Sequence, residues 1–523
     1  MKLTKFMFLG VLVLFSCSRE LSHEMKESQL DSKEDNSYLY SRGSKLENPY
    51  SVENMKKAFD ELQRNDQIPN NISENFIRTS HLYIKFIPKS EDEISKLKVD
   101  STLVLYPFPL DYKLSPEEEN SFVNNEDIIP YYASVPVNKT LPKDVKYEVL
   151  EKLFIPDEEK DDIDSSSIEI RQNENFVLTL VEKSLELTGN LDSEEALITD
   201  RRRRWRPAGK ITMQDVSLNR NTGIEGLKVK ARRWFTTHTG FVNANGDYSC
   251  NGTFRRDANY SFEWERYDFK IRGVQTGVSG PKKTGDWTVH YTKDKIENFC
   301  GTIFRAAHHY YYKDILNLRR PPQSSFWRTQ LKIRAVNQTN NGINGNANPI
   351  RNFLGIGNWI KIFNPQRTNS ETYGTTIHEL AHASHWNLSN AFSFSYVNTE
   401  GAVAETWACG VQWALTSMIY SNYDRNEYTR RMYTGLVRDL IDGYKTVTTD
   451  FYIDNSGNRV SLRKSYYDMV TGFNIRKIED ALINSTSWNV WNNKILQHHP
   501  HIINHQFANN AFGYWKSDHF FYY

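Results

Sequence analysis

Apolar residues recur along the chain with two spacings, and these predict where helices and strands lie. In residues 54–63 the apolar positions repeat every three or four residues, which is typical of a helix with one buried face. In residues 81–87 apolar and polar residues alternate, which indicates a strand. The longest helical pattern covers residues 296–316, and a short strand pattern covers residues 359–363. The repeated change between the two spacings predicts an α+β protein.

The length of the chain predicts more than one domain. It has 523 residues, which is too many for a single hydrophobic core. We therefore expect a multidomain fold with a small α/β domain, a central β-sandwich and a C-terminal, mainly helical domain with a small sheet. The predicted boundaries are 1–16 for a signal peptide, 17–48 for a flexible tether, 49–160 for the α/β domain, 161–206 for an acidic and then basic linker, 207–275 for the sandwich and 276–523 for the C-terminal domain.

The first residues have the pattern of an export signal. Lys2 and Lys5 precede an apolar run that is too short to span a membrane. The run ends in Leu14-Phe15-Ser16-Cys17, which resembles the lipobox of bacterial lipoproteins; the alternative is an ordinary secretory signal. The resemblance implies that Cys17 carries the lipid and that the protein lies in the cell envelope of a diderm bacterium. Because Ser18 is not Asp, the outer membrane is the expected location.

Charge and cysteine content exclude several classes of partner and cofactor. Lys and Arg number 65 against 64 Asp and Glu, so the net charge gives no reason to expect a nucleic-acid partner. Beyond Cys17, the chain has only Cys250, Cys300 and Cys409, at wide spacing. This pattern fits neither a disulfide framework nor a metal site made of paired cysteines.

Residues 207–272 resemble the carboxypeptidase regulatory-like (transthyretin-like) β-sandwich. The resemblance rests on Asn221-Thr-Gly-Ile-Glu-Gly226, on the strand pattern Leu227-Lys-Val-Lys-Ala231 and on the turn Asn245-Gly246-Asp247. The strand pattern places apolar side chains on one face and cations on the other. The resemblance implies a spacer or docking module without chemistry of its own.

The residues His378-Glu379-Leu380-Ala381-His382 carry the strongest chemical signal in the chain. On a helix, His378 and His382 lie four positions apart on one face and can present two imidazole nitrogens to one metal ion. Glu379 lies beside that position, where it can deprotonate a water bound to the metal. Thr375 or Thr376 is expected to cap the helix. The spacing predicts a zinc site in which Glu379 is the general base.

A tetrahedral zinc site needs a third protein ligand, and three residues compete for this place. His385 lies on the same helix, where three histidines seldom meet one ion, so a packed or supporting role is expected. Glu400 lies at or before the start of the next predicted helix, and Glu405 lies within it. We favour Glu405, because a carboxylate among apolar neighbours requires a cation.

These residues resemble the gluzincin group of metallopeptidases, in which a Glu on a second helix completes the site of an HExxH motif. Val403-Ala-Glu405-Thr-Trp-Ala408 is similar to that second helix, and Glu400-Gly401 is similar to the Glu-Gly of aminopeptidase-type members. Cys409 stands where thermolysin-like enzymes have an Asp that orients a zinc-binding His. The order of segments also resembles uncharacterised zinc-protease-like lipoproteins of Bacteroidetes-type bacteria.

The expected function is therefore that of a lipid-anchored zinc metallopeptidase that cleaves a peptide or protein substrate. The expected cofactor is Zn²⁺, bound by His378, His382 and Glu405. Residues 355–363 are expected to form an edge strand with which a substrate pairs. The alternative is a surface lipoprotein that binds a partner on the same scaffold without catalysis.

Overall fold

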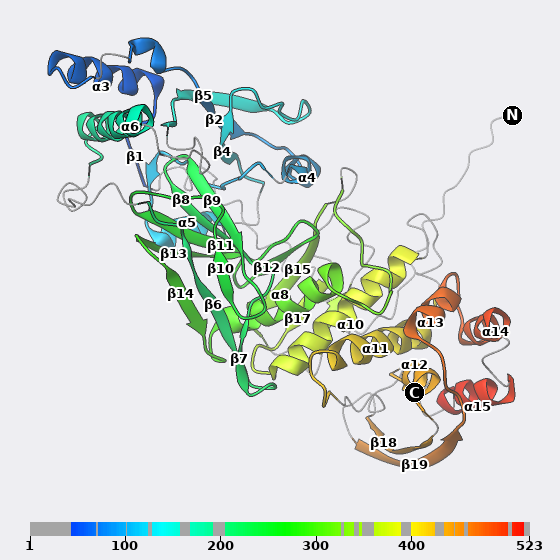
Figure 1. Ribbon diagram of the computed structural model, residues 1–523. Coiled ribbons are helices and arrows are strands. Elements are labelled where there is room, and N and C mark those ends of the chain that lie inside the picture. Colours follow the sequence, from blue (N-terminus) through cyan, green and yellow to red (C-terminus); the bar gives the residue numbers. More distant parts are fainter. Residues whose placement is uncertain are drawn as a thin grey trace, which may run out of the picture.

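The structure is a computed structural model in which three regions follow one another along an elongated molecule (Figure 1). It has a mixed α+β fold with several separate sheets. The described residues are 43–68, 72–100, 102–123, 128–156, 168–191, 204–325, 329–338, 345–347, 360–388, 399–423, 433–443, 445–453, 459–499 and 505–516. Cys17 and the predicted signal peptide lie outside these ranges. Within the ranges, none of the helices combines the length and the apolar character of a membrane span.

The N-terminal region packs helices against a three-stranded antiparallel sheet in the order β4-β2-β5. Its elements are β1 (Ser44–Lys45), α3 (Val52–Arg64), η1 (Glu74–Phe76), β2 (His81–Phe86), α4 (Glu91–Val99), β3 (Tyr112–Lys113), α5 (Pro116–Val123), β4 (Tyr131–Pro136), β5 (Tyr147–Leu153) and α6 (Ile168–Leu187). The side chain of Ser51 caps α3 by accepting a hydrogen bond from the backbone N–H of Asn54 at 3.0 Å. The predicted apolar face of α3 is buried, as expected.

Helix α6 lies inside the segment that was predicted to be a linker. Phe176, Leu180, Val181 and Leu185 are buried in the same hydrophobic core as α3, against which α6 packs. Leu180 and Val181 are adjacent, and Phe176 and Leu185 lie four or five positions to either side of them, so the four side chains form one apolar face of the helix. Part of residues 161–206 is therefore structured, and the amphipathic pattern in that segment marks a packed helix.

The central region contains two four-stranded sheets, in the orders β10-β6-β14, with β7 paired to β6, and β13-β11-β8-β9. The strands are β6 (Ala208–Asp215), β7 (Arg220–Gly223), β8 (Lys228–Arg233), β9 (Thr236–Phe241), β10 (Asp247–Ser249), β11 (Ala258–Glu263), β13 (Gly277–Lys283) and β14 (Trp287–Tyr291). Ile211 of β6 and Phe262 of β11 belong to one hydrophobic core shared by both sheets. Strands β13 and β14, which follow residue 275, pair within these sheets.

A third four-stranded sheet, in the order β12-β15-β17-β16, leads to the helices of the C-terminal region. Its strands are β12 (Phe269–Gly273), β15 (Leu331–Val336), β16 (Gly345–Ala347) and β17 (Ile360–Phe363). The first three strands of this order are parallel, and β16 is antiparallel to β17. The prediction that residues 355–363 form an edge strand is wrong for β17, because β15 and β16 flank it. Among the described strands, the edge beside β17 is β16.

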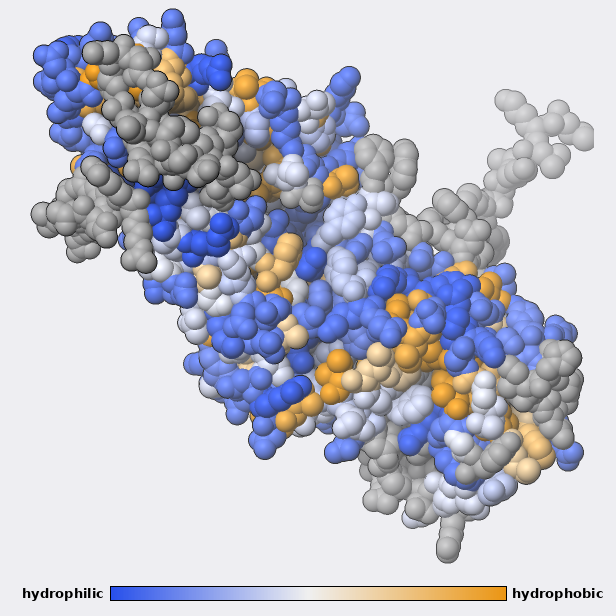
Figure 2. All heavy atoms as spheres, viewed as in Figure 1, coloured by the Kyte–Doolittle hydropathy of each residue, from blue (hydrophilic) through white to orange (hydrophobic). Residues whose placement is uncertain are grey.

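The C-terminal helices bury the long apolar patterns of the sequence. They are α8 (Ile296–Tyr312), α10 (Asn369–Leu388), α11 (Gly401–Ser417), α12 (Leu436–Ile441), α13 (Ile475–Leu482), α14 (Trp488–His498) and α15 (His505–Trp515), with a hairpin of β18 (Lys445–Ile453) and β19 (Arg459–Asp468). Helix α8 ends at Tyr312, four residues before the predicted Leu316, because the backbone becomes extended at Lys313. Leu316 and Asn317, with φ values of 57° and 62°, are not helical either. Helix α10 packs against α8 and α11. Figure 2 shows apolar residues gathered on the surface over α10 and α11.

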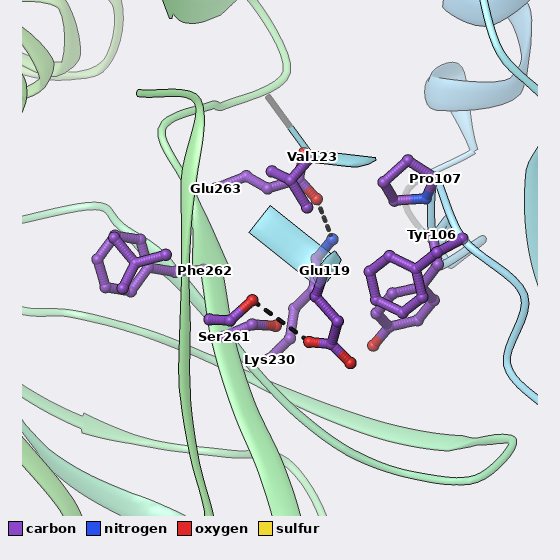
Figure 3. A pocket seen from close by; sticks show the side chains of 11 residues that line it. Tyr106, Pro107, Glu119, Val123, Lys230, Ser261, Phe262 and Glu263 are labelled. Carbon is purple, nitrogen blue, oxygen red and sulfur yellow. Dashed lines mark hydrogen bonds and ion pairs between the residues drawn. The ribbon is translucent and has the colours of Figure 1, made fainter. Parts of the chain in front are cut away.

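Charged side chains are buried where the N-terminal region meets the central region (Figure 3). Lys230 of β8 forms an ion pair with Glu263 at 2.7 Å, and Lys98 of α4 forms one with Glu265 at 2.8 Å. Lys270 lies 3.6 Å from both carboxylates. We call these five residues the interface cluster. Lys230, one of the cations predicted on one face of residues 227–231, is therefore covered by the neighbouring region. The cavity beside it has room for no more than about one water molecule.

Candidate metal centre

Helix α10 carries the HExxH residues and begins earlier than predicted. Its first turn starts at Asn369, and Thr368 and Glu371 exchange hydrogen bonds in the manner of a capping box. Thr375 and Thr376, the predicted caps, lie inside the helix instead. The motif therefore begins in the third turn, where the helix is buried against its neighbours on several sides.

The structure brings His378, His382 and Glu405 together, as predicted. Nε2 of His378 lies 3.2 Å from Nε2 of His382, and Oε2 of Glu405 lies 3.1 Å and 3.4 Å from these two nitrogens. Two ligand atoms at about 2.0–2.1 Å from a zinc ion, at a tetrahedral angle, are separated by about 3.3–3.4 Å. The three atoms are therefore spaced as ligands of one zinc ion. We call these residues the histidine cluster.

Gln412 of α11 determines which nitrogen of His378 faces the cluster. Its side-chain oxygen lies 3.1 Å from Nδ1 of His378, and its amide nitrogen donates to the hydroxyl of Tyr423 at 2.6 Å. With the amide in this orientation, Nδ1 carries the hydrogen, and the lone pair of the ring is on Nε2. Sγ of Cys409 is farther from Nδ1, at 4.0 Å.

Sequence reasoning looked for the orienting residue at Cys409 and missed Gln412. The two residues are three positions apart, so they share one side of α11. Gln412 also lies seven positions after Glu405, which is two helical turns and therefore the same face. A polar residue at this spacing in an otherwise apolar helix is the signal that identifies it.

The two competing candidates for the third ligand have other places. The carboxylate of Glu400 accepts a hydrogen bond from the backbone N–H of Trp488 at 2.9 Å, so it holds the start of α14. His385 is buried on α10 but does not belong to the group of converging ligand atoms. Burial, helped by the nearby His382, lowers the pKa of His385 to about 3, so its ring is neutral at physiological pH.

Electrostatic interactions within the histidine cluster outweigh the cost of burial. Burial alone would raise the pKa of Glu405, but the imidazoles of His382 and His378 hold this pKa well below its usual range. Burial alone would lower the pKa of His382, but the carboxylates of Glu405 and Glu379 raise it above its ordinary value. Glu405 is therefore ionised at neutral pH and can serve as a ligand.

Glu379 lies next to β16, the short antiparallel strand. Its side chain is buried, with a relative exposure of 6%. A Cβ atom added to Gly345 would lie 2.4 Å from Oε1 of Glu379, so the carboxylate occupies the space that a side chain at Gly345 would need. The predicted general base therefore lies against the edge of a sheet and is close enough to His382 to raise the pKa of that residue.

Two further sets of potential metal ligands lie outside the histidine cluster. His308 and His309 pack among aromatic rings of α8 and its neighbours, and His309 contacts the hydroxyl of Tyr373 at 2.6 Å. Neither belongs to a group of converging ligand atoms among the described residues. A second group of converging ligand atoms, which sequence reasoning missed, belongs to Asp439, Asp442 and Asp468.

The chain was compared with protein-family models, with curated proteins and with solved structures, and none of the three comparisons found a match. The site's own geometry is therefore the basis for assigning a function.

Proposed function

We propose that the chain is a zinc-dependent metallopeptidase of the gluzincin type, with His378, His382 and Glu405 as the protein ligands of the metal. The observation that carries this proposal is the convergence of three electron-pair donors at 3.1–3.4 Å inside a buried site. Such donors repel one another unless a cation or a proton lies between them. Two imidazoles and one carboxylate are a ligand set that is typical of catalytic zinc.

The chemistry assigned to the chain's own residues follows from their positions. Zinc bound at this site supplies Lewis acidity, which polarises a carbonyl group and lowers the pKa of a bound water to about 7. Glu379 accepts a proton from the water that attacks the peptide carbonyl and transfers this proton to the leaving amine nitrogen. Gln412 keeps His378 in the tautomer that leaves Nε2 free.

The edge of the third sheet offers a place for the substrate. Strand β16 pairs with β17 on one side, and it has no second partner among the described strands. An extended peptide that pairs with this edge passes close to Glu379, because Gly345 lies against that carboxylate. A peptide or protein substrate is consistent with this arrangement.

The remaining regions fit the anchoring role that we propose for them. The lipobox at Cys17 supports attachment to the outer membrane of a diderm bacterium. The central sheets and the N-terminal region separate Cys17 from the histidine cluster along the chain, which supports a role as spacer or docking module.

The proposal is tested with the full-length chain and its Glu379→Gln variant. Zinc content is measured by elemental mass spectrometry, and turnover is measured on a broad peptide library. We expect about one zinc per chain in both proteins and a loss of turnover of about 10²- to 10⁴-fold in the variant, because only the general base is removed. Glu371→Gln, on the first turn of the same helix, is the matched control and keeps both properties.

Two outcomes would contradict the proposal. Retained turnover in Glu379→Gln would exclude Glu379 as the base. Binding of a partner protein that is unaffected by the same substitution, together with no cleavage by the zinc-loaded chain, would favour a binding lipoprotein.

A further inference from the structure

A group of three acidic side chains lies away from the histidine cluster, where α12 meets the β18–β19 hairpin. Asp439 belongs to α12, Asp442 directly follows this helix, and Asp468 is the last residue of β19. One carboxylate oxygen of each residue lies within 4.8 Å of the other two. Asp439 and Asp468 have relative exposures of 0%. We call these three residues the aspartate cluster.

Hydrogen bonds from neighbouring groups fix the orientation of the two buried carboxylates. The hydroxyl of Tyr466 and the indole N–H of Trp515 both donate to Oδ2 of Asp439, the latter at 2.8 Å. The backbone N–H of Val470 donates to Oδ1 of Asp468 at 3.0 Å. The carboxylates are therefore held in place by residues of β19, α15 and the segment after β19.

One oxygen of each carboxylate is buried and has no hydrogen-bond donor among the described residues. These oxygens are Oδ1 of Asp439, Oδ1 of Asp442 and Oδ2 of Asp468. A buried carboxylate oxygen without a partner costs free energy, because it has lost its hydration without replacement. Asp439 and Asp468 are fully buried, so their two unpaired oxygens have no contact with bulk solvent.

The cations near the aspartate cluster neutralise the negative charges of its three carboxylates unevenly. Nζ of Lys445 contacts Oδ2 of Asp442 and lies 3.5 Å from Oδ1 of Asp439. Nε of Arg438 lies 3.5 Å from Asp442. Among the described residues, neither cation forms an ion pair with Asp468, and burial, together with the charges of the other two carboxylates, raises the pKa of Asp468 to about 7.

We propose that the aspartate cluster binds one Ca²⁺ ion, with Asp439, Asp442 and Asp468 as ligands. The donor atoms are all carboxylate oxygens, which hard divalent cations prefer. The three oxygens all lie within 4.8 Å of one another, so one ion at calcium–oxygen distances of about 2.3–2.6 Å can reach each of them. Magnesium demands a near-ideal octahedron at about 2.0–2.1 Å and keeps several of its waters, whereas calcium accepts an irregular set of carboxylates.

The bound ion braces the helix that supports the proposed zinc site. Helix α12 packs on α11, where a Cβ atom at Gly410 would lie 2.4 Å from Val437. The hydroxyls of Thr406 and Thr434 meet at 2.9 Å, and Thr406 is the neighbour of Glu405. Calcium therefore ties the hairpin to α12, and α12 in turn backs α11.

Titration of the full-length chain with CaCl₂, followed by calorimetry and by thermal unfolding, tests the proposal. The experiment is run with and without one equivalent of zinc. We expect one calcium ion per chain and an upward shift in unfolding temperature. His382→Ala keeps calcium binding, which separates failure of this proposal from failure of the proposed zinc site. Asp60→Asn, on the exposed side of α3, is the control for loss of one carboxylate.

Two variants of the aspartate cluster distinguish a calcium site from an ion-paired cluster. Asp468→Asn weakens calcium binding by about tenfold or more, because it removes a buried ligand charge. Lys445→Met tightens binding, because it removes the cation that competes for the same oxygens. Asp442→Asn, at a partly exposed position, repeats the first test if Asp468→Asn does not fold.

Several results would overturn the assignment. One is an absence of binding at about 10 mM calcium, a concentration above the dissociation constants of extracellular calcium modules. Another is calcium binding that persists in both Asp468→Asn and Asp442→Asn. Magnesium that binds as tightly as calcium, or weaker binding in Lys445→Met, would also overturn it.

Discussion

The interface cluster and the histidine cluster are both buried groups of ionisable side chains, but their charges are arranged differently. In the interface cluster each carboxylate faces an ammonium group, at 2.7 Å for Glu263 with Lys230 and 2.8 Å for Glu265 with Lys98. In the histidine cluster two imidazole nitrogens and a carboxylate oxygen face one another at similar distances. The first group contains its own counter-charges, whereas the second presents electron pairs to a common point.

This difference separates a structural role from a ligand-binding role. A buried ion pair is satisfied when its partners are present, and its loss affects folding. A set of converging acceptors is satisfied only when it takes up a cation, either a metal ion or a proton, from outside the chain. We therefore predict that substitutions in the interface cluster lower stability, whereas substitutions in the histidine cluster lower metal content.

The largest effect is expected from Glu405→Ala. Loss of a residue that only hydrogen-bonds a metal ligand lowers metal affinity by up to about 100-fold. Glu405→Ala removes one of the three ligands themselves, so we expect a larger fall in zinc affinity. Zinc content after dialysis against a weak chelator measures this. Glu400→Ala is the matched control. In the wild type, the Glu400 carboxylate accepts a hydrogen bond at the start of α14 and is not one of the converging ligand atoms. Loss of zinc only in Glu400→Ala would show that the ligand has been misplaced.

The next effect concerns the interface cluster. Glu265→Gln leaves Lys98 and Lys270 without their shared carboxylate, and removing one partner of a buried pair costs about 3–5 kcal/mol. Chemical denaturation, followed by a probe in the N-terminal region, measures the loss. Zinc content stays unchanged, and Glu117→Gln, at an exposed position of α5, leaves stability unchanged. An altered zinc content in Glu265→Gln would remove the distinction between the two clusters.

A smaller effect is expected from Gln412→Met, which takes away the acceptor for Nδ1 of His378. Loss of such an orienting partner lowers metal affinity by about 10- to 100-fold. Gln412→Glu restores an acceptor at the same place and should restore affinity. Chelator competition on both variants measures the difference. Equal affinity in wild type and Gln412→Met would show that the ring orientation is set by packing alone.

The sequence was sufficient where a pattern is local. The apolar face of α3 and the positions of His378 and His382 follow from helical spacing, and Glu405 follows from the need of a buried carboxylate for a cation. The mixed α+β fold is confirmed for the described residues. The domain boundaries, the zinc and the peptidase activity stay predictions.

Where contacts depend on distant segments, the sequence was insufficient. The cations of β8 look exposed from their alternation, but Lys230 is covered because Leu105 and Tyr106 lie against it and α5 packs on the same sheet. Strand β16 has three residues in a stretch rich in Gly and Asn, so it has no periodicity to detect. The aspartate cluster joins residues about 30 positions apart across a hairpin, and only the pairing of β18 with β19 brings them together.

The aspartate cluster has some ion pairs, like the interface cluster, and some unpaired acceptors, like the histidine cluster. The pH dependence of the protein's stability shows which of the two it resembles. Burial raises the pKa of Asp468 to about 7, so the folded chain holds this proton at pH values where the unfolded chain has lost it. Without calcium, this carboxyl therefore lowers stability progressively as pH rises from about 4 to about 7, and the loss is constant above that range. Asp468→Asn stays neutral and should gain about 2 kcal/mol relative to wild type between pH 5.5 and 8, since one pKa unit corresponds to about 1.4 kcal/mol and about 1.5 units separate pH 5.5 from the folded pKa.

Thermal unfolding of both proteins at the two pH values, with and without calcium, measures this gain. Calcium at saturation should reverse it, because the ion favours the charged carboxylate that the Asn variant lacks. A gain that persists with calcium present would mean that Lys445 and Arg438 are the cluster's only counter-charges. The aspartate cluster would then belong with the interface cluster, as a self-contained network of ion pairs.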